Sequence, residues 1–185
     1  MKKIILISIL VCYSLNTFGQ EHIEINLIKA DSTWGKEIIK VPFWFAPKID
    51  YQGYEDIRFA KGWEDINSSG FWTLVFAWDI NLKTKPTTKF FEGNIKRYFD
   101  GLMKVVNEND TLILPKTKVS FIENKTNSEK TTFTGTIETY DAFTTKKMIA
   151  LNVTIESYYL NSMTEWYSFY VFLAFLESII TTLIV

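Results

Sequence analysis

The sequence predicts an α+β domain in which a mostly antiparallel sheet of six to eight strands carries one long helix packed on a face. Two observations lead to this class. Segments of alternating hydrophobicity lie on both sides of a single helical pattern, so strands and helix are segregated and do not alternate. In addition, residues 71–80 are apolar at both parities, which is typical of a central strand covered on both faces. A closed barrel with the helix as a plug or lid is the alternative.

Residues 71–80 are predicted to form the central strand. Because successive side chains of a strand point to opposite faces, both faces of this strand would be apolar. One face would carry two tryptophans and a phenylalanine, and it therefore needs a broad partner surface. The helix predicted directly after this strand can supply that surface.

One helix is predicted over residues 89–106, with Thr88 as its N-cap. Gly93 and Gly101 each weaken a helix by about 1 kcal/mol relative to alanine. We therefore expect both glycines where the helix packs closely on the sheet. Apolar residues recur at steps of four and three and would form one stripe facing the sheet: Phe91, Ile95, Tyr98, Leu102 and Val106.

Three strands are predicted before the central one, over residues 21–30, 38–46 and 55–60. The second contains Pro42, which donates no ladder hydrogen bond and favours an edge position or a bulge. In the third, Arg58 is expected to point outward. Four more strand patterns follow the helix, and the last two form a long antiparallel hairpin: residues 112–114, 118–123, 132–140 and 148–159.

Residues 166–185 are almost entirely apolar, with Glu177 as the single charge. Alternation from Tyr167 favours a last strand that ends at about Phe175. The length also permits a membrane helix, but Glu177 and the β-branched residues argue against it. A third interpretation is a shifted reading frame that replaces the natural end after about Thr164.

Residues 1–19 have the pattern of a secretory signal peptide: two lysines, a short apolar core, and small residues before a cut after Gly19. Cleavage would leave residues 20–185 as a single α+β domain in the periplasm or outside the cell. A lipoprotein cut before Cys12 is disfavoured, because no small residue directly precedes this cysteine. Cys12 is the only cysteine, so the exported chain would contain no disulfide.

The composition argues for a folded domain without a nucleic-acid partner. The chain has 185 residues, which suits one domain, and it is 47% hydrophobic, which supports a packed core. Its net charge of −1 lacks the basic excess that attracts nucleic acids or an anionic membrane surface.

The scarcity of reactive residues excludes several classes of enzyme. His22 is the only histidine and lies near the new N-terminus, so neither a catalytic triad nor a His/Cys zinc site is expected. We predict no metal and no cofactor. Carboxylates remain, since Glu64 follows Trp63 and Asp79 closes the central strand. Retaining glycosidases use two carboxyl groups about 5 Å apart, so a small carboxylate-dependent hydrolase acting on glycans is the alternative function.

Aromatic residues in predicted loops are the other candidates for a site. Trp63 and Phe143 lie among polar residues, where they can stack on sugars or enter a partner's pocket. They can equally cover the ends of the core. The loop over residues 141–147 is longer than a tight hairpin needs. The predicted binding residues are Trp63, Glu64, Asp79, Tyr140, Asp141 and Phe143.

Three segments, FWFAP at residues 43–47, IRFAKGW at 57–63 and YDAFTTKKM at 140–148, together resemble a group of small exported proteins of Gram-negative bacteria without an assigned function. The resemblance spans roughly residues 38–159. It implies one exported domain and brings no catalytic residues. The end after Thr164 departs from that group.

The sequence therefore predicts an exported, non-catalytic binding or envelope-associated domain. Its partner would be a small molecule, a glycan or an envelope protein. Membrane contact through the C-terminal tail is disfavoured.

Overall fold

The computed structural model describes residues 25–108, 111–126, 130–160 and 167–174. The predicted signal peptide and the end of the tail lie outside the described residues. The elements follow one another as β1 (Gly35–Val41), β2 (Gly53–Phe59), β3 (Leu74–Leu82), α2 (Thr88–Val106), β4 (Lys118–Thr126), β5 (Lys130–Tyr140), β6 (Met148–Leu160) and β7 (Tyr167–Ala174).

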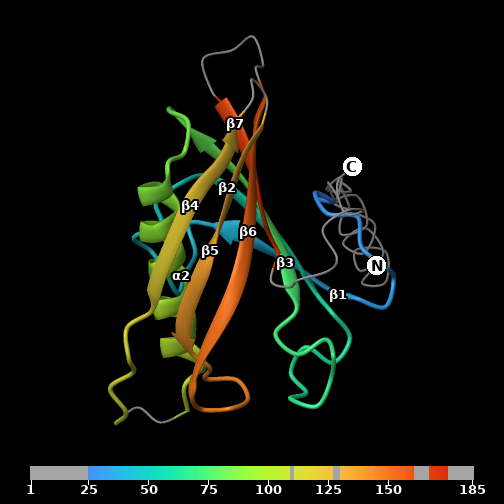
Figure 1. Ribbon diagram of the computed structural model, residues 1–185, viewed down its shortest axis with the longest axis vertical. Helices are drawn as coiled ribbons and strands as arrows, with labels where there is room; N and C mark the ends of the chain where they lie inside the picture. The colour runs from blue at the N-terminus through green and yellow to red at the C-terminus, as the bar shows by residue number, and fades with distance from the viewer. Residues whose placement is uncertain (1–24, 109–110, 127–129, 161–166, 175–185) are drawn as a thin grey trace, which may run out of the picture.

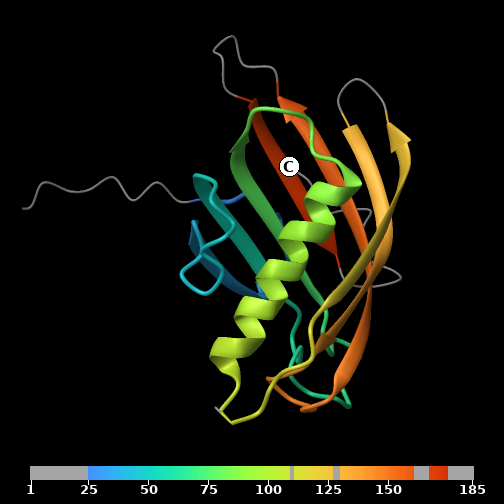
Figure 2. The same cartoon turned by 90° about the vertical axis from the view of Figure 1, so that its left-hand side faces the viewer.

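The strands form two antiparallel three-stranded units, β1-β2-β3 and β4-β5-β6. The backbone of β7 pairs antiparallel with β3 on one side and with β6 on the other, so the order is β1-β2-β3-β7-β6-β5-β4. β1 and β4 are the edges, so the described strands form an open arrangement and not a closed one. Figures 1 and 2 show α2 lying across one face of the strands. The α+β class and the antiparallel pairing are confirmed, and the described residues contain one helix, as predicted.

β3 lies between β2 and β7 and is covered on both faces. Its residues facing α2 are buried, and so are Val75 and Ala77 on the opposite face. Phe43 and Phe45, predicted to be within a strand, lie in the turn that follows β1, yet both are buried in the core. The residues of β3 that face α2 are Leu74, Phe76, Trp78, Ile80 and Leu82.

The helix begins one residue before its predicted start. Thr87 is the N-cap, and its side-chain oxygen accepts the N–H of Phe90. The predicted close packing of the helix is confirmed at Gly101, where an added Cβ would lie 2.2 Å from the carbonyl oxygen of Phe45. At Gly93 an added Cβ would meet only the end of the flexible Arg97 side chain at 3.3 Å.

Residues 25–30 cover the sheet face opposite α2, and they do so as an extended segment instead of the predicted strand. The carboxylate of Asp56 accepts the N–H groups of Leu27 at 2.8 Å and Ile28 at 3.1 Å. Arg58 pairs with Asp56 and donates to the carbonyl of Ile28 at 3.1 Å. The expectation that Arg58 points outward to solvent is therefore wrong, because this segment covers it. Ile28 packs there with Val75 and Ala77.

The predictions for residues 112–114 and for the C-terminal tail had different outcomes. Residues 112–114 form no strand and belong to the extended connection between α2 and β4. In the tail, β7 supplies the predicted last strand, while residues 175–185 lie outside the described residues. No helix in the described part of the chain has both the length and the apolar character needed to cross a membrane.

Candidate binding site

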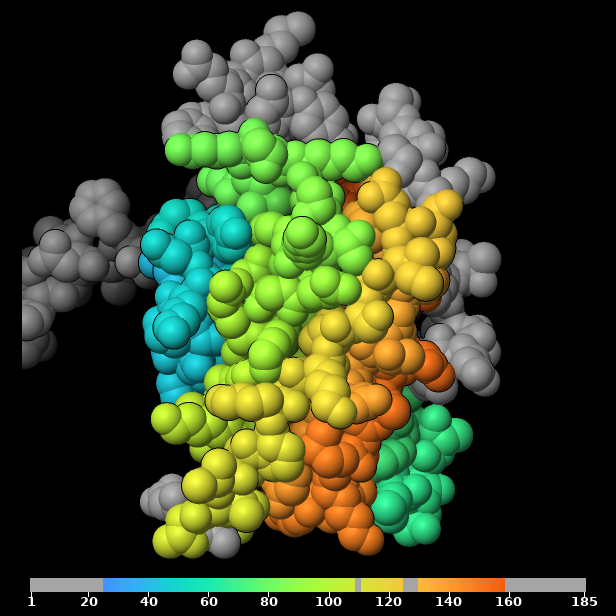
Figure 3. All heavy atoms as spheres, turned by 60° about the vertical axis from the view of Figure 1, so that its left-hand side comes forward, coloured from blue at the N-terminus to red at the C-terminus, as the bar shows by residue number. Residues whose placement is uncertain are grey.

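Three connections gather at one end of the molecule, which we call the loop end. They are residues 60–73 between β2 and β3, residues 111–117 between α2 and β4, and residues 141–147 between β5 and β6. Figures 1 and 3 show all three at the lower end of the view. The loop end therefore holds both predicted site loops.

Asp141 organises the loop between β5 and β6. Its side chain is buried, and Oδ1 accepts the N–H groups of Phe143 at 3.0 Å and Thr144 at 3.1 Å. Oδ2 accepts the N–H and the hydroxyl of Thr145, both at 2.7 Å. Burial acts to raise the pKa of Asp141, but the hydrogen bonds from Thr145 and Thr144 outweigh it and lower this pKa. Asp141 is thus an ionised acceptor that shapes the loop.

An aromatic ledge, made of Trp63, Trp72 and Phe143, crosses from one loop to the next. The Trp63 ring lies 5.3 Å from Phe143 and 6.3 Å from Trp72, and the Phe143 ring lies 5.9 Å from Trp72, all centroid to centroid. Trp72 is buried, while Trp63 and Phe143 are half-buried. Trp63 also packs on Phe59 at 5.0 Å, so the ledge continues the core outward.

Hydrogen bonds fix the two loops to each other. The Thr144 hydroxyl donates to the carbonyl of Glu64 at 3.1 Å. Within the first loop, the N–H of Trp72 donates to the carbonyl of Trp63 at 2.9 Å. The aromatic rings of the ledge are consequently held in place by backbone contacts as well as by their own packing.

Of the six predicted residues, the structure brings Trp63, Asp141 and Phe143 together, while Tyr140 precedes Asp141 in the chain at the end of β5. Glu64 lies beside them, but only its backbone carbonyl takes part, and the residue is exposed. Asp79 is not brought to this end. It lies five residues beyond Leu74 on β3, roughly 17 Å along the strand, and on the face opposite α2. Burial raises the pKa of Asp79.

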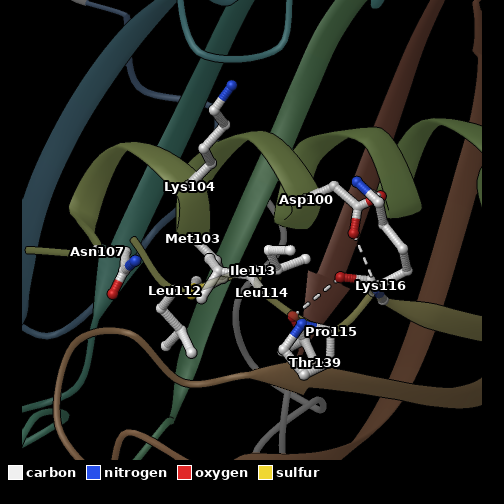
Figure 4. Close-up of a pocket in the computed structure, with 11 residues that line it drawn as sticks. Asp100, Met103, Lys104, Asn107, Leu112, Ile113, Leu114, Pro115, Lys116 and Thr139 are labelled. Carbon is white, nitrogen blue, oxygen red and sulfur yellow. Dashed lines mark hydrogen bonds and ion pairs between the residues drawn. The ribbon is translucent and has the colours of Figure 1, made fainter. Parts of the chain in front are cut away.

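A pocket of about 290 Å³ lies at the loop end between the last turns of α2 and the connection that follows (Figure 4). Met103 links it to the ledge, because the Met103 sulfur accepts the N–H of Ala142 at 3.4 Å. This volume is near the lower limit for small-molecule sites. The apolar part of its lining comes from Met103, Leu112, Ile113, Leu114 and Pro115.

The pocket lining contains both acceptors and donors, since Asp100, Thr117 and Thr139 line it together with Lys104, Lys116 and Asn107. Thr117 and Thr139 are buried, and their hydroxyl oxygens lie 3.0 Å apart. A hydroxyl oxygen has two lone pairs, so this pair can still accept hydrogen bonds from a ligand. Burial acts to raise the pKa of Asp100, but the Thr117 N–H and Lys96 outweigh it and lower this pKa, which favours the charged carboxylate. Figure 4 shows the Lys104 side chain pointing away from the pocket.

Sequence reasoning missed the pocket and one buried acid. Glu55 on β2 is fully buried and accepts the indole N–H of Trp78 at 2.7 Å and the hydroxyl of Tyr98 at 3.1 Å. Burial raises the pKa of Glu55 to about 8, although both hydrogen bonds favour its charged form. Along β2, Glu55 alternates with Ile57 and Phe59 and therefore lies on the same face as these two apolar residues. An acidic residue on that apolar face is the sequence signal that could have revealed the buried glutamate.

Comparisons with known proteins found no matching family model, no matching curated protein and no matching solved structure. The resemblance to exported proteins of Gram-negative bacteria stays a prediction. Within the described ranges, no group of three or more histidine, cysteine, aspartate or glutamate side chains is placed to hold a metal ion.

Proposed function

We propose that the chain is an exported, non-catalytic binding domain that holds a small hydroxylated ligand, such as the terminal sugar of a glycan, at the loop end. The observation that carries this proposal is the pocket of about 290 Å³ beside the aromatic ledge. The acceptors Thr117, Thr139 and Asp100 suit the hydroxyl donors of a sugar. Trp63 and Phe143 suit its apolar face.

Titration of the full chain with a panel of short oligosaccharides, followed by calorimetry, tests this function. Thr139→Val keeps the shape of the side chain and removes the hydroxyl, so we expect an approximately tenfold loss of affinity. Trp44→Ala is the matched control, because Trp44 is 76% exposed and lies outside the site. Equal binding by the wild type and by both Thr139→Val and Trp63→Ala would contradict the proposed site. Thermal melts run in parallel separate loss of binding from loss of fold.

The alternative function is a carboxylate-dependent glycan hydrolase. A retaining hydrolase needs two carboxyl groups about 5 Å apart. Glu64 lies at the loop end and Asp79 lies further along β3, so their separation does not support the hydrolase. Turnover of any glycan that is abolished by Glu64→Gln would favour the hydrolase over the binding domain.

The proposal also includes export and a single continuous sheet. We expect N-terminal sequencing of the chain secreted by a Gram-negative host to begin near Gln20. The expectation of six to eight strands in one sheet is supported by the pairing of β7 with both β3 and β6.

A further inference from the structure

A second groove, of about 670 Å³, lies at the end of β3 away from the loop end. Its volume is within the usual range of small-molecule sites. The lining comes from the connection between β1 and β2, from the end of β3 with the residues that follow it, and from the first turn of α2. β3 runs from Leu74 at the loop end to Leu82 at the groove, so the two sites lie roughly 26 Å apart along the strand.

A backbone hydrogen bond joins two sides of this groove. The N–H of Asn81 donates to the carbonyl of Gln52 at 3.2 Å. This bond lies one position beyond the last ladder pair of β2 and β3, which sets Gly53 opposite Ile80. Gln52 therefore lies opposite Asn81, and directly opposite side chains of an antiparallel pair are neighbours. Both side chains are exposed, so two carboxamides meet the solvent next to each other at the groove.

The apolar part of the groove is mainly aromatic. The rings of Tyr51 and Phe90 lie 5.6 Å apart, centroid to centroid, and both residues are half-buried. Leu82, which is buried, completes the apolar lining. A half-buried ring is fixed by its neighbours and still offers part of its surface, on which the apolar face of a sugar can pack.

The polar side chains of the groove are not engaged by other described residues. Asp50, Gln52 and Asn81 make no side-chain hydrogen bond or ion pair within the described ranges, whereas acceptors of the loop-end pocket already bond to protein groups. A carboxamide both donates and accepts hydrogen bonds, as a sugar hydroxyl does. Among the described lining residues only Asp50 and Lys83 are charged, so the groove has no net charge. This chemistry suits a neutral hydroxylated ring.

We propose that the groove is a second sugar-binding site, in which Gln52 and Asn81 bond the hydroxyls of a neutral sugar and Tyr51 contacts its apolar face. The inference rests on the proposed function and extends it from one glycan site to two. Because the sites are roughly 26 Å apart, a single short oligosaccharide does not fill both. Each chain is therefore bivalent and can bridge two glycans, which strengthens its binding to a surface that carries many of them.

Nuclear magnetic resonance of the full chain reports the two sites separately. The probes are short neutral oligosaccharides of glucose, galactose, mannose and N-acetylglucosamine. The side-chain amide signals of Gln52 and Asn81 report the groove, and the indole N–H signal of Trp63 reports the loop end. We expect at least one probe to shift both sets of signals. A shift of Trp63 alone would overturn the second site but keep the proposed function. Shifts of the two amides alone would leave one site per chain and overturn bivalency.

Variants at the groove separate sugar binding from folding. Gln52→Ala removes one exposed carboxamide, so we expect an approximately tenfold weaker response of the Asn81 amide signal to the sugar, with an unchanged thermal melt. Lys48→Ala is the matched control, because Lys48 is exposed in the same connection and does not line the groove. Thr139→Val should leave the affinity of the groove unchanged.

Two results would overturn the second site. One is equal affinity of the groove in Gln52→Ala and Lys48→Ala. The other is a wild-type dimer in sedimentation that Gln52→Ala lacks and that the oligosaccharides do not dissociate, which would assign the groove to a second copy of this chain.

Discussion

Trp63 and Phe143 depend on each other for burial, since each ring rests on the other and on Trp72. We expect Trp63→Ala or Phe143→Ala to lower the free energy of unfolding by about 2 kcal/mol, between the small effect of an exposed side chain and the 3–5 kcal/mol of a fully buried one. Urea denaturation measures this loss. Trp44→Ala, at a site 76% exposed, should cost less than about 0.5 kcal/mol. A loss above about 4 kcal/mol at Trp63 would make it a core residue and remove it from the ligand site.

Glu55 makes the stability of the protein depend on pH. Its folded pKa of about 8 lies above its ordinary value of 4.5, so the native state holds a proton that the unfolded state has released. The stabilising contribution of protonated Glu55 to the free energy of unfolding is fully present below pH 4.5. It is lost as pH rises to about 8, at about 1.4 kcal/mol per pH unit.

Glu55→Gln removes this titration while it keeps an acceptor for the Trp78 indole. We expect the difference in unfolding free energy between wild type and variant to change steeply between about pH 5 and 8 and to level off above. Urea denaturation at several pH values measures it. A difference that does not vary with pH would show that Glu55 ionises at its ordinary pKa.

At the scale of elements, the two glycines of α2 give a matched pair of substitutions. Gly101→Ala would place a Cβ 2.2 Å from the Phe45 carbonyl oxygen, so we expect it to destabilise the fold by more than about 2 kcal/mol. Gly93→Ala meets only a flexible arginine and should instead stabilise by up to about 1 kcal/mol. Thermal melts of the two variants should shift in opposite directions. Equal shifts would mean that α2 does not press on Phe45.

The elements also differ in whether the sequence alone could predict them. The helix, the central strand and the hairpin of β5 and β6 have local periodicity, so their residues suffice to identify them. The buried state of Arg58 depends on residues 25–30, about thirty positions away, and alternation alone does not encode that contact. The pocket likewise needs Thr117 and Thr139, which meet only through the register of β4 with β5.

Among the predicted site residues, the difference between Asp141 and Asp79 is also physical. Asp141 precedes a run of backbone N–H groups that its carboxylate can accept, and Thr144 and Thr145 after it are the local sign of such a turn. Asp79 has no comparable local pattern. Its distance from the loop end follows from where β3 begins, and boundaries of strands are set by pairing partners.

At the scale of the whole molecule, β7 is the only described strand that connects the two three-stranded units by backbone pairing. Its loss would leave β3 and β6 with unpaired edges, and β3 carries the aromatic core residues Phe76 and Trp78. A small sheet that loses its middle strand also loses the burial that stabilises it.

We therefore expect a chain that ends at Thr164 to lose its cooperative thermal transition, while a chain that ends at Ala174 retains it, because only the second contains β7. Circular dichroism during heating measures the transition, and binding of a hydrophobic dye reports exposed apolar surface. The comparison also decides between a working last strand and a replaced natural end after about Thr164. If the chain ending at Thr164 melts cooperatively at the wild-type temperature, the two units are stable without β7, and the single-sheet proposal is wrong.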